Sequence, residues 1–243
     1  MTDAASAAEP VTVVLVHGAF ADGSGWNGVV ERLQAAGVPV RAIVNPLRGI
    51  SVDTAYVASV FSQIPGRILA VGHSYGGAII TNAATDAANV VGLVYVAAFA
   101  PDEGEALQDI EAGSTDSVLN SAIRPSSYPT GSGTETEFSI DPASFHSAFA
   151  GDLSEKDAAV MAAEQRPVAA AAFGEKNGPP AWKNRPAWAV VATGDKAAGA
   201  DVVRSMAQRA KAEITEVDGS HVIMISQPQA VTDVIMKALQ SVA

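Results

Sequence analysis

The sequence predicts an α/β protein in which helices cover both faces of one mostly parallel sheet, with a helical cap inserted late in the chain. Three observations predict this class. Short runs of apolar and β-branched residues, typical of strands buried on both faces, alternate with stretches whose apolar residues recur at helical spacing. This alternation breaks at Pro101 and resumes near residue 187. The chain has 243 residues, 48% of them apolar, which is enough for one large core.

Four strand-like runs lie in the first hundred residues, at 11–16, 39–44, 67–71 and 90–98. The spacing of apolar residues between them predicts helices over residues 26–37, 51–64 and 78–88. Gly37 closes the first helix, and Ser51 can cap the second. We expect the second helix to bury a stripe of four apolar residues, Val52, Tyr56, Val60 and Ile64.

Residues 101–186 interrupt this pattern. They contain many prolines and no convincing strand, so we interpret them as a mostly helical cap on a core made of residues 1–100 and 187–243. After the cap we expect a strand, a helix and a strand over residues 188–193, 201–210 and 214–217. A last helix follows Pro228 and should bury Val231, Val234, Ile235, Ala238 and Leu239.

The acidic composition excludes several classes of partner. The chain has 26 acidic and 15 basic residues and a formal net charge of -11. Such a chain offers no positive field to nucleic acid or to a membrane surface, so we expect neither as a partner. It contains no cysteine, which excludes disulfides and thiolate chemistry. No cluster of histidine, aspartate and glutamate at ligand spacing indicates a metal, and we expect no cofactor.

We find no pattern typical of a secretory signal or a membrane span. Residues 1–10 lack a basic stretch followed by an apolar core, and we interpret them as a loose arm. The longest nearly apolar run, residues 90–101, is too short to cross a bilayer. We therefore expect a soluble, cytoplasmic protein, whose oligomeric state, a homodimer included, stays open.

The segment Gly72-His73-Ser74-Tyr75-Gly76 stands between a strand-like run and a helix-like run. A sharp strand-to-helix turn in this G-x-S-x-G pattern raises the serine Oγ at the carboxyl edge of the sheet, and the flanking glycines avoid clashes with neighbouring backbone. Ser74 is therefore the candidate nucleophile. The alternative is a tight turn whose serine only caps the helix.

A serine nucleophile needs a base to take its proton. Of the four histidines, His17 and His73 occupy glycine-flanked turns, and His146 lies in the cap. His221 follows the last predicted strand, in a loop at the carboxyl edge of the sheet, where a late histidine can reach Ser74. His221 is therefore the candidate base, and the alternative is a surface-loop histidine.

The base in turn needs a carboxylate that fixes its tautomer. Asp195 directly follows a predicted strand and would lie at the same edge of the sheet as the serine and the histidine. Asp102 and Glu103, after the preceding strand, are alternatives, as is Asp218, which is close to the histidine along the chain. Asp195 is the leading candidate.

An acyl-transfer site also needs backbone N–H groups that hold the developing oxyanion, each worth about 3 kcal/mol. The N–H of Tyr75 opens a helix and is free to donate. A second donor should be the N–H of Ala19, just after His17-Gly18 on the loop that follows the first strand. The alternative is that this segment is simply a tight turn at the end of the first strand. That alternative is compatible with the proposed role, because the donor is a backbone N–H.

Residues 23–28, Gly-Ser-Gly-Trp-Asn-Gly, match the G-x-G-x-x-G pattern of dinucleotide-binding sites. The context does not fit, because the preceding strand ends near Val16 and no acidic residue follows the second strand to hold a ribose. We interpret these glycines as a flexible loop that lets Trp26 pack.

The cap contains several large side chains that could cover a cleft, namely Phe138, Phe145, His146, Phe149, Met161, Phe173 and Trp182. We expect most of them to form the core of the cap. Some should cover the cleft, which would favour an apolar acyl or alkoxy group in the substrate.

The segments His17-Gly18, 72–77, Asp195 and 219–221 resemble the α/β-hydrolase superfamily across the whole predicted sheet. In detail the chain looks most like small bacterial esterases related to plant methylesterases and hydroxynitrile lyases. Lyases of that branch typically carry threonine after the first histidine and lysine after the catalytic one, where this chain has Gly18 and Val222. The resemblance therefore implies a hydrolase rather than a lyase.

The site residues and the resemblance together imply a cofactor-free serine hydrolase that cleaves small apolar carboxylic esters through an acyl-enzyme. Ser74 would attack the carbonyl, His221 would transfer the proton, Asp195 would orient His221, and the N–H groups of Ala19 and Tyr75 would hold the oxyanion. Two alternatives stay open: a cofactor-free lyase or perhydrolase with the same triad, and a ligand-binding protein whose triad is too slow to matter. One departure from the family pattern is the loop 196–200, which lacks the Ile-Pro that commonly follows the acid.

Overall fold

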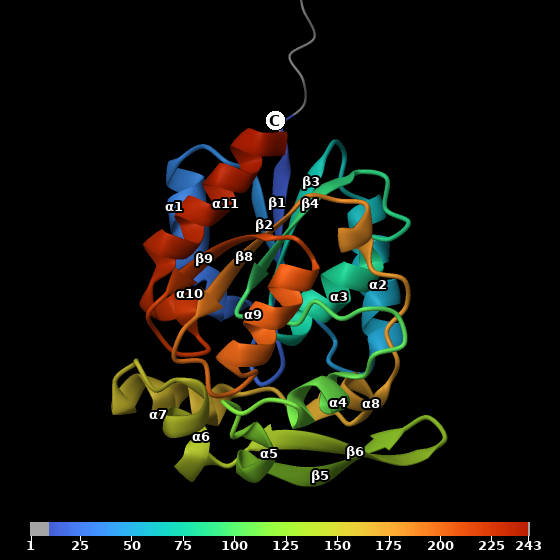
Figure 1. Cartoon of the computed structure of the whole chain (residues 1–243). Helices are drawn as coiled ribbons and strands as arrows, with labels where there is room; N and C mark the ends of the chain where they lie inside the picture. Colours follow the sequence, from blue (N-terminus) through green and yellow to red (C-terminus); the bar gives the residue numbers. More distant parts are fainter. Residues whose placement is uncertain (1–9, 243) are drawn as a thin grey trace, which may run out of the picture.

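A six-stranded parallel sheet forms the centre of the computed structural model, which describes residues 10–242 (Figure 1). The strand order is β2-β1-β3-β4-β8-β9. The strands are β1 Thr12–Val16, β2 Val40–Ile43, β3 Ile68–His73, β4 Val90–Val96, β8 Ala187–Ala192 and β9 Glu213–Val217. The predicted fold class is confirmed. The predicted N-terminal arm lies outside the described residues, except for Pro10.

Helices cover both faces of this sheet, as predicted. One face carries α2 Ile50–Ser62, α3 Tyr75–Ala83 and α9 Ala200–Arg209, and the other carries α1 Asn27–Ala35 and α11 Pro228–Val242. Because side chains alternate along a strand, Val14 and Val16 of β1 enter the first core, whereas Val13 and Leu15 enter the second. Every residue of β3 and β8 is buried, which explains why residues 68–71 of β3 and all of β8 are unbroken apolar runs in the sequence.

Helix α2 and the residues after it bury only part of the predicted stripe, since Ile64 is buried and Val60 packs partly buried against the core. The helix is preceded by Gly49 as its N-cap, not by Ser51. Val52 and Tyr56 of the predicted stripe are 54% and 43% exposed. The buried residues are Ile50, Asp53, Val57 and Phe61. Apolar residues occur on several faces of this segment, and the buried face includes an aspartate, so apolar spacing alone selected only part of the buried face.

Residues 101–186 contain helices, as predicted, and three strands, so the prediction that this segment has no strand is wrong. The helices are α4 Leu107–Ala112, α5 Leu119–Ala122, α6 Pro142–Phe149, α7 Glu155–Glu164 and α8 Ala171–Gly174. The strands β5 Ile123–Thr130, β6 Gly133–Ile140 and β7 Val168–Ala169 form an antiparallel sheet in that order. β5 and β6 are largely exposed and so lack an apolar run, and β5 tolerates Pro125 and Pro129 because it is an edge strand.

The elements α4 to α8, β5 and β6 of this segment lie beyond the carboxyl ends of the parallel strands (Figure 1). Several contacts join the segment to the loop before α2, two of them close polar contacts to Arg48 and Leu47. Glu137 of β6 forms an ion pair of 2.7 Å with Arg48, and the N–H of Ala169 in β7 donates to the carbonyl oxygen of Leu47 at 2.9 Å. We interpret residues 101–186 as a cap of mixed helix and strand over the edge of the sheet to which the candidate site residues belong.

No helix within residues 10–242 combines the length and the apolar character that crossing a membrane requires.

Candidate active site

Ser74 occupies the sharp turn between β3 and α3, where the sequence predicted it. Its backbone has φ 53° and ψ -125°, in a region that non-glycine residues rarely adopt. The Ser74 N–H donates to the carbonyl oxygen of Val96 at 3.3 Å, and the Ser74 carbonyl oxygen accepts from Gly77 at 2.9 Å and Phe99 at 3.2 Å. These bonds fix the strained residue at the end of β3.

The glycines around Ser74 stand where backbone segments touch. A Cβ on Gly72 would lie 2.6 Å from the carbonyl oxygen of Gly76, and a Cβ on Gly76 would collide with the carbonyl oxygen of Val16 at the end of β1. Gly18, on the loop after β1, lies against the serine itself, since a Cβ there would be 2.6 Å from the Ser74 Cβ. The loop after β1 and the turn after β3 are therefore in direct contact.

His221 and Asp195 form a buried pair in the loops after β9 and β8. The Nδ1 of His221 lies 2.8 Å from Oδ2 of Asp195, and both side chains are 1% exposed. The other carboxylate oxygen, Oδ1, accepts from the N–H groups of Ala197 at 2.9 Å and Ala198 at 3.1 Å. A carboxylate held in this way accepts the Nδ1 proton of the imidazole and leaves Nε2 as the acceptor nitrogen.

The alternative acids bond elsewhere. Asp102 forms an ion pair of 2.5 Å with Lys183, and this bond lowers the pKa of the Asp102 carboxyl. Glu103 is exposed, and its N–H donates to Asp102 at 2.7 Å. Asp218 accepts from the hydroxyl of Thr193 at 3.3 Å. Of the four candidate acids, the structure brings Asp195 to His221.

His73, which the sequence analysis left without a role, supports the loop of His221. Its Nε2 donates to the carbonyl oxygen of His221 at 2.9 Å, and the two ring centroids are 4.7 Å apart. Burial lowers the pKa of His73 well below its usual range, so this ring is neutral. His221 therefore lies beside the residue that precedes Ser74 in the chain.

The other two histidines have structural partners. His17 donates from Nδ1 to the carbonyl oxygen of Gly18 at 2.9 Å and accepts at Nε2 from the N–H of Asn45 at 3.0 Å, and burial lowers its pKa. His146 donates from Nε2 to the carbonyl oxygen of Leu153 within the cap, at 2.9 Å. Neither arrangement brings these rings to Asp195.

Ala19 and Tyr75, the predicted oxyanion donors, lie on the two segments that meet at Gly18 and Ser74. Ala19 is buried directly after Gly18, and Tyr75 is the first residue of α3, where backbone N–H groups have no acceptor within the helix. The Tyr75 hydroxyl donates to Oδ2 of buried Asp53 at 2.8 Å, and burial raises the pKa of both side chains. This anchor was missed because the G-x-S-x-G pattern leaves the residue after the serine open, and Asp53 belongs to no recognisable motif.

Aromatic side chains of the cap cover the His221 side of the site. The ring of Phe149 in α6 lies 4.9 Å from the His221 ring and 6.2 Å from that of Phe20, which follows Ala19. Phe173 of α8 stacks on Phe20 at 6.3 Å. The expectation that part of the cap aromatics covers the site therefore agrees with their positions.

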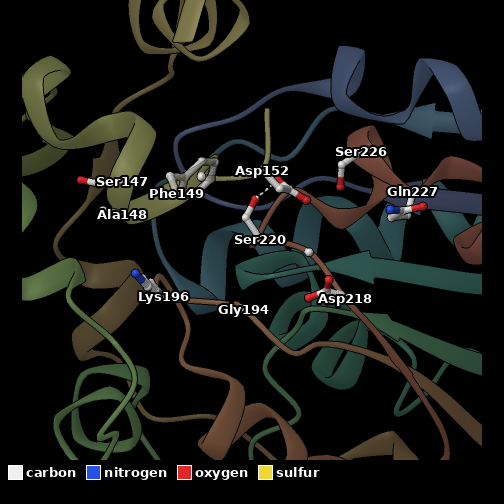
Figure 2. Close-up of a pocket in the computed structure, with 12 residues that line it drawn as sticks. Ser147, Ala148, Phe149, Asp152, Gly194, Lys196, Asp218, Ser220, Ser226 and Gln227 are labelled. Atoms are coloured by element: carbon white, nitrogen blue, oxygen red, sulfur yellow. Dashed lines mark hydrogen bonds between the residues drawn. The ribbon is translucent and has the colours of Figure 1, made fainter. Parts of the chain in front are cut away.

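Two cavities flank this buried group, and Ser74 lines neither. One of about 420 Å³ lies between the end of α6 and the loops after β8 and β9 (Figure 2). Figure 2 shows Asp152 and Ser220 turned toward each other across its wall, where the Ser220 hydroxyl donates to the Asp152 carboxylate. The other, of about 150 Å³, is lined by Phe20, Met161 and Met224 among others.

Residues 23–28 do not form a dinucleotide loop. They make up the 3-10 helix η1 Gly23–Trp26 and the start of α1, and Trp26 is fully buried, as expected. η1 is capped by Asp22, which accepts from the N–H of Ser24 at 2.8 Å. Within the described part of the chain, no group of three or more histidine, aspartate or glutamate side chains is arranged to hold a metal ion.

Comparison with known proteins places the chain in a family. Residues 13–234 match the model of the alpha/beta hydrolase family. No match to a curated protein sequence was found.

Solved structures share the fold at low sequence identity. Polyneuridine aldehyde esterase is 20% identical with a TM-score of 0.78 over 96% of this chain and 99% of its own. A methylesterase from Arabidopsis is 18% identical with a TM-score of 0.78, over 95% and 99%. Tomato methylketone synthase I is 19% identical with a TM-score of 0.78, over 96% and 99%. With the family model spanning nearly the whole sheet and its flanking helices, the chain belongs to the alpha/beta hydrolase family.

Proposed function

We propose that the protein hydrolyses small apolar carboxylic esters with Ser74 as nucleophile, His221 as base and Asp195 as the acid that orients His221. The observation that carries this proposal is the buried Asp195–His221 hydrogen bond of 2.8 Å, in loops at the same edge of the sheet as the strained turn of Ser74. An activated serine needs this combination of a base and an acid that fixes its tautomer.

In the proposed reaction, Ser74 Oγ forms a bond to the carbonyl carbon of the ester while His221 Nε2 takes the serine proton. The tetrahedral intermediate then collapses, and the alcohol leaves with that proton. Water attacks the acyl-serine by the same steps, so that the acid is released and Ser74 regains its proton. Asp195 stabilises the imidazolium that forms twice in each cycle.

The N–H groups of Ala19 and Tyr75 are the proposed donors to the oxyanion. Their positions support this role, since Ala19 follows the glycine that touches Ser74 and Tyr75 opens α3 directly after it. Each donor of this kind contributes about 3 kcal/mol to the stabilisation of the transition state.

The apolar surroundings support an apolar substrate. Phe20, Phe149 and Phe173 lie close to His221, directly or through one another, at centroid distances of 4.9 to 6.3 Å. Two of the similar structures are of an esterase and a methylesterase, which favours ester cleavage. The methylketone synthase shows that this fold also serves other reactions. The activity of this chain therefore has to be argued from its site residues and not from its fold.

Activity and binding assays separate this proposal from its alternatives. We expect the protein to hydrolyse p-nitrophenyl esters and to show no cyanohydrin cleavage and no peroxide-dependent halogenation. Asp195→Asn should lower kcat for the ester by about three to four orders of magnitude, because the amide favours the wrong imidazole tautomer. Faster cyanohydrin cleavage or halogenation than ester hydrolysis would favour the lyase or perhydrolase. Tight ligand binding with about one turnover per molecule would favour a binding protein.

A further inference from the structure

We propose that two residues of the cap, Ser117 and Glu111, are positioning residues that hold Asp195, and through it His221, in the orientation that catalysis requires. This inference rests on the proposed function of Asp195 and His221. It concerns a chain of hydrogen bonds that begins in the cap and ends at the imidazole.

The chain passes through two consecutive peptide groups after Asp195. Oδ1 of Asp195 accepts from the N–H groups of Ala197 at 2.9 Å and Ala198 at 3.1 Å. The carbonyl oxygens of the same two peptide groups belong to Lys196 and Ala197. The direction in which these carbonyls are held therefore sets the direction of the N–H groups that hold the carboxylate.

The cap bonds to both of these carbonyl oxygens. The N–H of Val118 donates to the oxygen of Lys196 at 2.8 Å, and the hydroxyl of Ser117 donates to the oxygen of Ala197 at 2.6 Å. Each peptide group that donates to Asp195 is thus bonded at its other end to the cap. Hydrogen bonds linked through one peptide group also polarise one another, which strengthens the bond to the carboxylate.

Glu111 is the first member of this chain of hydrogen bonds. Its role follows from the fact that the Ser117 hydroxyl has only one proton to donate. Glu111 is buried in α4, and its Oε1 lies 3.2 Å from the Ser117 hydroxyl oxygen. The single hydroxyl proton of Ser117 already points to the carbonyl of Ala197, which can only accept. A bond between Glu111 and Ser117 then requires the proton of the carboxylic acid. Burial raises the pKa of Glu111 to about 7, which agrees with a protonated side chain in mildly acidic solution.

The segment that carries Ser117 is itself fixed to the core. The Ser114 hydroxyl donates to Oδ1 of Asp201 at 2.5 Å, and the Thr115 N–H donates to Oδ2 at 2.8 Å. Asp201 lies in the first turn of α9, directly after the loop 196–200. The cap contacts therefore restrain the loop that holds the Asp195 carboxylate.

The test compares four variants with the wild-type protein at about pH 6.5, below the pKa of about 7 that burial gives Glu111. The variants are Ser117→Ala, Glu111→Leu, Glu111→Gln and a matched control, Ser121→Ala, whose hydroxyl donates to Val118 O within the cap. One measurement is the rate of labelling by a fluorophosphonate, in which Ser74 Oγ bonds to phosphorus, fluoride leaves with its bonding electrons and His221 takes the proton. The others are kcat and KM for p-nitrophenyl butyrate and the melting temperature.

We expect Ser117→Ala and Glu111→Leu to be labelled about tenfold more slowly than wild type, with kcat reduced by about the same factor and KM changed by less than about twofold. Glu111→Gln should stay within about twofold of wild type, because its amide N–H donates to Ser117 in place of the acid. Ser121→Ala should do the same. A variant that has a lower melting temperature but is labelled at the wild-type rate would show that the replaced residue has only a structural role.

Wild-type labelling rates in folded Ser117→Ala and Glu111→Leu would overturn the proposal. Equal losses in Glu111→Gln and Glu111→Leu would overturn the role of Glu111 as a proton donor. If Ser117→Ala does not fold, the comparison of the two Glu111 variants decides. If the proposed function is wrong, the wild-type protein itself will not be labelled. This outcome is distinct from the failure of the positioning role, in which the wild-type protein is labelled.

Discussion

Ser74 carries the strain of the site in its own backbone. Its φ of 53° costs on the order of 1–3 kcal/mol for a residue with a Cβ. The surrounding structure compensates with three backbone hydrogen bonds, to Val96, Gly77 and Phe99. Nothing in the fold requires a non-glycine residue at this turn. The presence of a serine despite the strain therefore indicates that its side chain is needed here.

Substitution of Gly18 tests how closely the loop after β1 must approach Ser74. We expect Gly18→Ala to lower kcat/KM for an ester by at least about a hundredfold, because its Cβ would lie 2.6 Å from Ser74 Cβ and must displace the loop that carries the proposed Ala19 donor. Gly23→Ala is the matched control, since the nearest heavy atom to its Cβ is 3.9 Å away. Equal activity of the two variants in a steady-state assay would contradict this account.

Glu111 should make stability depend on pH. Its pKa rises from an ordinary value of 4.5 to about 7 in the folded protein, so between these values the folded state binds a proton that the unfolded chain has lost. The contribution of Glu111 to the free energy of unfolding should therefore fall as the pH rises through this window, by up to about 3 kcal/mol, and stay level below and above it. Glu111→Gln cannot titrate and should lack this part of the fall.

Denaturant unfolding of both proteins at a series of pH values measures that difference. Other carboxyl groups titrate in the same range, but they contribute equally to both proteins. Curves for wild type and Glu111→Gln that stay parallel from pH 4.5 to about 7 would contradict a raised pKa at Glu111.

At the scale of the element, the start of α2 depends on Asp53. The carboxylate accepts from the N–H of Arg48 at 3.0 Å and from the Tyr75 hydroxyl at 2.8 Å, and it is fully buried. We expect Asp53→Ala to reduce the free energy of unfolding by about 2–4 kcal/mol, because it leaves buried donors without an acceptor. Val52→Ala, on the exposed face of the same helix, should change it by less than about 0.5 kcal/mol. A loss for Asp53→Ala as small as that for Val52→Ala, in urea unfolding, would contradict this role.

The same helix shows where apolar spacing fails as a predictor. The spacing located α2 correctly and placed Val60 and Ile64 toward the core. It also selected Val52 and Tyr56, which are exposed, and it missed Asp53, which the helix buries. Hydrogen bonds from Arg48, Gly49 and Tyr75 stabilise this buried aspartate, and such contacts leave no trace in local apolar periodicity. The strands β5 and β6 escaped prediction for a related reason, since both are largely exposed.

At the scale of the whole molecule, the parallel sheet was predictable because burial on both faces demands unbroken apolar runs, as in residues 68–71 of β3 and in β8. Chain order then assigned Ser74, Asp195 and His221 to one edge, and the structure joins Asp195 to His221. The hydrogen bonds from Ser117 and Val118 to the loop after Asp195 were not predictable, because they depend on how the cap folds back over that edge.

The most direct test of the central claim is the intact mass of the protein after treatment with a fluorophosphonate, compared with that of Ser74→Ala. A serine made nucleophilic by His221 and Asp195 reacts, whereas an ordinary serine does not. We expect one adduct on the wild-type protein and none on the variant. No adduct on the folded wild-type protein, or an adduct that persists in Ser74→Ala, would contradict the assignment of Ser74 as the nucleophile.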